Sequence, residues 1–134
     1  MSLGWRAVTA ATWVCVILAL AAVWNASVQL GLSTWWLGPR SEPRPRIVQV
    51  SPFIAPVMMV LGAVNQVRWL PVLGVAAAGV VAAVGLGDLD RIESLATIEI
   101  VIAVAAALVS LASLAGVYRR VGTADTDPDA TAAR

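Results

Sequence analysis

The stretch that decides the fold is "IVQVSPFIAPVMMVLGAVNQVRWLPVLGVAAAGVVAAVGLG", residues 47–87, because it contains a single charged residue, Arg68. As one helix it would run for roughly 60 Å at ~1.5 Å per residue, about twice the ~30 Å hydrocarbon thickness of a bilayer. Two membrane-spanning helices joined near Arg68 fit this length. Pro71 suits the first turn of the second of them.

Two further charge-free stretches, residues 7–31 and 100–118, are 25 and 19 residues long. The whole sequence is 60% hydrophobic and 13% charged, with a mean hydropathy of +0.85, whereas soluble domains are roughly 45–50% apolar. A chain this short cannot close a lipid-exposed sheet. The sequence therefore predicts an all-α, polytopic membrane protein, a small bundle of four transmembrane helices at about 7–31, 47–66, 69–87 and 95–118.

The segments outside these helices are short. The first helix carries a signal-like Ala19-Leu20-Ala21 triplet, but its apolar stretch runs on to Leu30, so we expect it to stay uncleaved. Residues 32–46 are rich in Pro and are expected to be extended. The polar, acidic tail 121–134 is expected to be disordered, and no segment outside the helices is long enough to form its own core.

The residue types that carry most enzyme chemistry are missing from the sequence. It contains no His and one Cys, which excludes histidine metal sites, histidine general bases and iron–sulfur clusters held by this chain alone. No phosphate-binding Gly loop and no G-x-S-x-G elbow occurs. We expect no catalytic residue, no cofactor, no metal and no nucleic-acid partner, and therefore no enzyme.

Glu99 is the acidic residue closest to the apolar run of the fourth helix. Because residues 100–118 can span a bilayer alone, Glu99 is expected at the membrane boundary. There we expect it to take part in ion pairs between the first and third connections. Four other residues are expected to take part in these pairs: Glu93, Arg44, Arg46 and Arg91. The alternative is that the fourth helix begins near Glu93 and draws Glu99 inward by ~9 Å, where it could handle a cation or a proton.

Four amide side chains lie near the ends of the first two helices: Asn25, Gln29, Asn65 and Gln66. Asn25 and Gln29 are four residues apart and therefore share one helical face. Interhelical hydrogen bonds or solvation at the interface explain such residues, and a polar substrate pocket is the alternative.

These features favour a non-catalytic accessory or assembly subunit of a larger bacterial membrane complex, respiratory or of the cell envelope. Its partners would be the lipid bilayer and other membrane subunits, and it could form a homo-oligomer. The alternative is a small oligomeric transporter coupled to a cation or proton through Glu99. In length and helix count the chain resembles the small multidrug resistance transporters, but that family has its working Glu in the first helix, where residues 7–31 have no acid.

The charges assign an orientation within the inner (plasma) membrane. With four spans both termini share one side, and each side carries four arginines near the membrane. The acids near the membrane all lie with the first and third connections: Glu42, Asp88, Asp90, Glu93 and Glu99. The side with the more positive balance is expected to be cytoplasmic, so both termini are expected in the cytoplasm.

Cysteine labelling in intact cells tests this topology. In a Cys15→Ser background, cysteines placed at Ser41 and Asp90 should react with a membrane-impermeant reagent, and those at Ser2 and Thr126 should be protected. The reverse pattern would invert the orientation. Labelling at position 2 without labelling at 126 would contradict the count of four spans.

Overall fold

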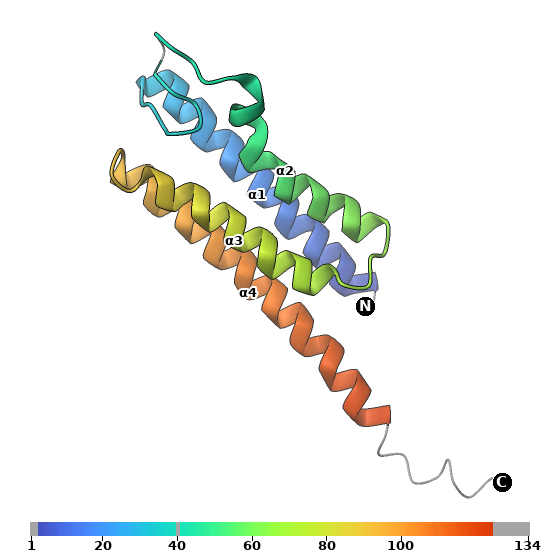
Figure 1. Ribbon diagram of the computed structural model, residues 1–134. Helices are drawn as coiled ribbons and strands as arrows, with labels where there is room; N and C mark the ends of the chain where they lie inside the picture. The colour runs from blue at the N-terminus through green and yellow to red at the C-terminus, as the bar shows by residue number, and fades with distance from the viewer. Residues whose placement is uncertain (1–2, 40, 125–134) are drawn as a thin grey trace, which may run out of the picture.

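The computed structural model describes residues 3–39 and 41–124, which form four helices joined by short connections (Figure 1). No strand occurs within these ranges. The helices are α1 (Leu3–Leu30), α2 (Arg46–Val64), α3 (Leu70–Asp88) and α4 (Glu93–Ala124). Each contains a segment that is long and apolar enough to cross a membrane, which confirms the predicted all-helical fold with four candidate spans.

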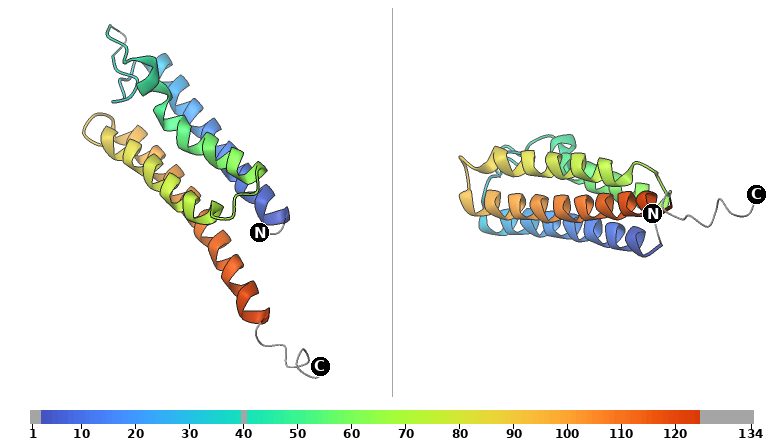
Figure 2. Two further views of the ribbon diagram at one scale, coloured as in Figure 1. Left: turned by 45° about the vertical axis from the view of Figure 1, so that its right-hand side comes forward. Right: turned by 90° about the horizontal axis from the view of Figure 1, so that it is seen from below.

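The helices form an antiparallel bundle in which each helix contacts two others. α1 packs against α2 and α4, and α3 packs against α4 and α2, with the most extensive contact between α3 and α4. Two views show α4 continuing beyond the ends of the other helices (Figures 1 and 2). We call the end that holds connections 31–45 and 89–92 the acidic end, and the end where α1 begins and residues 65–69 join α2 to α3 the arginine end.

α2 contains two buried prolines, Pro52 and Pro56, and remains helical from Arg46 to Val64. A proline inside a helix removes the N–H that would bond the carbonyl four residues earlier. For Pro52 that carbonyl belongs to Val48, and the hydroxyl of Ser51 donates to it at 2.7 Å. The Ser51 side chain therefore supplies the donor that Pro52 lacks.

Small side chains allow α3 and α4 to pack closely. The buried face of α4 repeats at intervals of three and four residues, as expected for one face of a helix: Ala96, Glu99, Ala103, Ala106, Ser110 and Ser113. Opposite this face, a Cβ atom added to Gly85 of α3 would lie 3.0 Å from Cβ of Glu99 and 3.0 Å from Cγ1 of Ile100. Gly85 thus allows a close approach of the two helices around Glu99.

The helix ends differ in places from the expected ones. α4 begins at Glu93, earlier than the expected position 95, and continues to Ala124, past the expected end at 118. Residues 121–124 of the predicted tail are therefore helical, and residues 125–134 lie outside the described residues.

Two glycines of α3 provide a matched test of this packing. Gly85→Val should lower the free energy of unfolding by about 2 kcal/mol, because the added methyl groups overlap Glu99 and Ile100. A Cβ atom added to Gly79 would have no neighbouring atom within 4 Å, so Gly79→Val should change stability little beyond the shared effect of valine on the helix. Unfolding of both variants in mixed micelles measures the difference, and equal losses would contradict the close contact.

Candidate functional site

Two carboxyl groups are buried together at the acidic end of the bundle. Asp88 is the last residue of α3 and Glu99 lies in the second turn of α4, and both are 0% exposed. They are close enough for their charges to interact. This placement differs from the expected position of Glu99 at a solvated boundary.

The hydrogen bonds of this pair are incomplete. Asp88 Oδ1 accepts a hydrogen bond of 2.7 Å from the backbone N–H of Trp35. Asp88 Oδ2 and both carboxyl oxygens of Glu99 have no hydrogen-bond partner of strict geometry among the described residues. Asp88 Oδ2 thus lacks the donor that buried polar atoms normally have, and the Trp36 indole N–H is the donor that acts on the Glu99 carboxyl.

Trp35 attaches the first connection to the last turn of α3. Its indole Nε1 donates to the carbonyl oxygen of Val84 at 3.0 Å, in addition to the bond from its backbone to Asp88. A Cβ atom at Gly87 would lie 2.7 Å from that Nε1, so only glycine leaves room for the ring there. Gly87 of α3 therefore provides the space that the Trp35 ring occupies.

Trp36 lies fully buried beside the carboxyl pair. Its ring packs edge-on against Trp24 of α1 at a centroid distance of 5.7 Å and against Phe53 of α2 at 6.2 Å. Its Nε1 meets no strict hydrogen-bond geometry, but its N–H acts as a hydrogen-bond donor toward the Glu99 carboxyl. Aromatic rings from three segments thus form a cluster around Trp36, the ring that interacts with Glu99.

The charged residues predicted to pair with Glu99 lie elsewhere. Arg44, Arg46, Arg91 and Glu93 are all exposed, and none of them forms an ion pair with another described residue. Only Arg91 acts on the pair, through its electrostatic interaction with Asp88. Glu99 does not pair with these residues because α4 begins at Glu93, which places Glu99 in the second turn of the helix, on the face that packs against α3.

The four amide residues remain near the helix ends. Gln29 Nε2 donates to Asn25 Oδ1 at 3.1 Å within α1, and this hydrogen bond is exposed. Asn65 Nδ2 donates to the carbonyl oxygen of Leu61 at 2.9 Å and closes the end of α2. Gln66 lies in the next turn with a positive φ of 60°. None of these hydrogen bonds joins two helices.

Asp88, Trp35 and Trp36 belong to the site but were not predicted from the sequence as site residues. Asp88 lies within the charged segment "DLDRIE" and therefore looks like part of a connection. The signal that could have found it is its helical register, since buried Gly74, Ala78, Val81 and Gly85 precede it on the same face of α3.

Comparison with known proteins adds nothing to this site: no protein-family model, curated protein or solved structure matches the chain. Among the described residues, no group of three or more His, Cys, Asp or Glu side chains could hold a metal ion. Two buried carboxyls whose charges interact can bind a proton or a small monovalent cation.

Removal of the Asp88 carboxyl should loosen the first connection. In Asp88→Ala the N–H of Trp35 loses a charged acceptor, a bond of about 1.5–3 kcal/mol, so amide hydrogen exchange at Trp35 should accelerate by about tenfold or more. Asp90→Ala, which changes an exposed carboxyl two residues away, is the matched control. Unchanged exchange at Trp35 in Asp88→Ala would show that Asp88 does not hold the connection.

Proposed function

We propose that this chain is a multi-pass protein of the inner membrane, with both termini in the cytoplasm, that binds a proton or a small monovalent cation at Asp88 and Glu99 and moves it across the membrane. The observation that carries this proposal is the complete burial of Glu99 where its charge interacts with that of Asp88, while neither Glu99 oxygen forms a hydrogen bond of strict geometry with a described residue and the Trp36 indole N–H is the donor that acts on it. This burial supports the alternative expectation from the sequence, in which Glu99 handles an ion or a proton, better than it supports a solvated Glu99 at the membrane boundary.

The physical argument rests on the energetic cost of the ionised pair. Ionisable side chains within membrane spans are costly and generally serve ion or proton pathways. An unpaired buried charge is destabilising by several kcal/mol, and here two carboxylates would also repel each other. Binding one positive charge between Asp88 and Glu99 removes most of that cost, so the pair has a physical reason to take up a proton or a cation.

The accessory role remains a second proposal, supported by the surface of the bundle. α4 continues past the other helices (Figure 1), and the small residues Gly79 and Ala83 of α3 are exposed. Both features would suit a non-catalytic assembly subunit that packs against a larger bacterial membrane complex. The two roles are compatible, because an accessory subunit can carry an ion-binding pair.

Reconstituted vesicles test the first proposal. Vesicles containing the protein should move protons or alkali cations down an imposed gradient, and Glu99→Gln should abolish the movement because the neutral amide cannot exchange a charge. Glu93→Gln is the matched control, since Glu93 lies on the same helix but is exposed. Equal flux in the Glu99→Gln and Glu93→Gln variants would remove Glu99 from the mechanism.

Purification of the tagged chain in mild detergent tests the accessory role. Stoichiometric recovery of another membrane subunit, retained after a salt wash, is the expected result. Recovery of the chain alone as a homodimer would count against an accessory role and would leave the flux measurement unaffected.

A further inference from the structure

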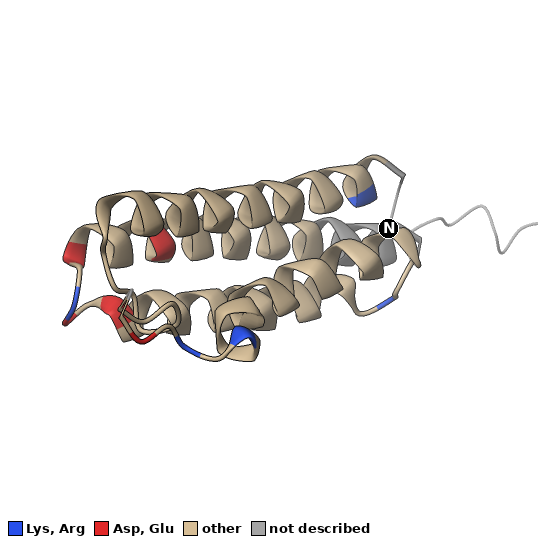
Figure 3. Cartoon of the chain, turned by 90° about the horizontal axis from the view of Figure 1, so that it is seen from above, with Lys and Arg blue, Asp and Glu red and all other residues tan. Residues whose placement is uncertain are grey.

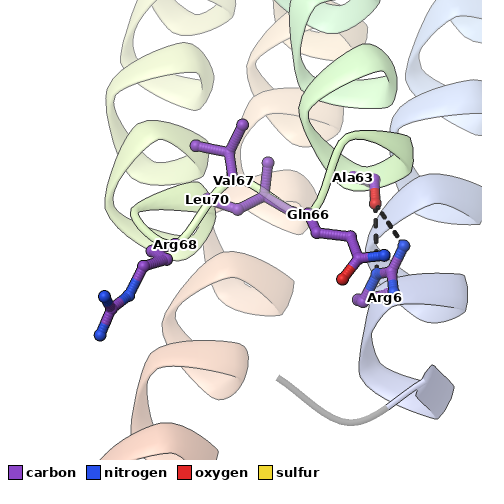
Figure 4. A pocket seen from close by; sticks show the side chains of 6 residues that line it. All are labelled: Arg6, Ala63, Gln66, Val67, Arg68 and Leu70. Atoms are coloured by element: carbon purple, nitrogen blue, oxygen red, sulfur yellow. Dashed lines mark hydrogen bonds between the residues drawn. The ribbon is translucent and has the colours of Figure 1, made fainter.

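The arginine end of the bundle, opposite the carboxyl pair, contains two adjoining hollows. The first has a volume of about 110 Å³ and is lined by Arg6, Ala63, Gln66, Val67, Arg68 and Leu70 (Figure 4). The second is an apolar groove of about 500 Å³ between α2 and α3, which also includes Val67 and Leu70. A polar hollow at the end of the bundle therefore adjoins an apolar groove along its side.

The polar hollow is positively charged. The Arg6 guanidinium donates from Nε and Nη2 to the carbonyl oxygen of Ala63 and from Nη2 to that of Val64, each at 3.3 Å. These bonds cover carbonyls at the C-terminal end of α2, where the helix dipole is negative. The positive end of the α3 dipole, at Leu70, remains at the same hollow.

Arg68 adds a second positive charge. Its side chain is exposed and forms no hydrogen bond or ion pair with the described residues. Figure 4 shows the Arg6 and Arg68 guanidinium groups on opposite sides of the connection between α2 and α3. All acidic residues of the described ranges lie toward the other end of the bundle (Figure 3), so no carboxylate within those ranges competes for these arginines.

The apolar groove extends over most of the depth of one lipid leaflet. At ~1.5 Å per residue it runs ~15 Å from Ala55 to Asn65 and ~10 Å along α3 from Leu70 to Ala77, compared with ~15 Å for half of a ~30 Å hydrocarbon core. Met58 and Met59 line it, and methionine adapts its shape to flexible apolar ligands. Next to the hollow, Trp69 is 71% exposed, as is usual for tryptophan at the level of lipid headgroups.

From this combination we infer that the arginine end is a binding site for an anionic phospholipid. The headgroup phosphate lies over the connection 65–69 between Arg6 and Arg68, and one acyl chain lies in the groove between α2 and α3. Basic pockets between transmembrane helices bind anionic headgroups in this manner. The site is separate from the carboxyl pair and does not depend on the proposed ion binding.

Native mass spectrometry with two lipids of identical acyl chains tests the headgroup site. Phosphatidylglycerol should remain bound in preference to phosphatidylcholine, and Arg68→Gln should weaken phosphatidylglycerol binding about fivefold, as expected for one arginine at an anionic surface. Arg46→Gln, the same substitution of an exposed arginine at the acidic end, should leave this preference unchanged. Arg68→Lys should keep most of it, which separates loss of charge from loss of folding.

A second pair of variants tests the groove. Ala55→Leu places a larger side chain in the groove and should weaken both lipids, whereas Ala76→Leu, on an exposed position of α3 outside it, should weaken neither. The inference would be overturned by equal binding of the two lipids, by an equal effect of Arg68→Gln and Arg46→Gln, or by full competition by inorganic phosphate alone. A lipid-free dimer would also overturn it, by assigning the groove to a second copy.

Discussion

The close approach of α3 and α4 at Gly85 is the constraint on which the acidic end depends. Because position 85 has no side chain, the backbone of α4 can lie near enough for Glu99 to project between the two helices. Along the rest of the contact, the residues that α4 buries are also small, so the two helices can pack closely there as well. A bulkier residue at position 85 would separate the helices and give Glu99 access to the lipid or to water.

The carboxyl pair at the contact between α3 and α4 also interacts with the first connection, residues 31–45. Asp88 accepts the backbone N–H of Trp35, while Trp36 packs beside Glu99 with Trp24 and Phe53. A change of charge at the pair therefore alters the acceptor that holds the connection in place. The bundle separates this chemistry from the arginine end, where Arg6 and Arg68 have no acidic neighbours among the described residues (Figure 3), so each membrane surface would meet a different part of the chain.

The sequence predicts the four helices well and the site poorly, for a physical reason. Charge-free length determines whether a segment can span a bilayer, and this criterion needs no tertiary contact. The burial of Glu99 depends on where α4 begins and on which face meets α3. Glu99 lies on the same helical face as Ala96, Ala103 and Ala106, and this spacing indicates that it is buried with them. A count of charge-free residues misses this, because it starts the span only at Ile100. Contacts made by Trp35 join segments about fifty residues apart, which no local pattern specifies.

Carboxyl labelling of the folded protein in lipid vesicles tests the burial of Glu99 most directly. A water-soluble carbodiimide with an added amine should modify the exposed Glu42 and Glu93 and leave Glu99 unmodified, as peptide mapping would show. A membrane-soluble carbodiimide should modify Glu99, because an apolar reagent can enter the bundle from the lipid. Modification of Glu99 by the water-soluble reagent at the rate of Glu93 would contradict a buried carboxyl pair and the function proposed for it.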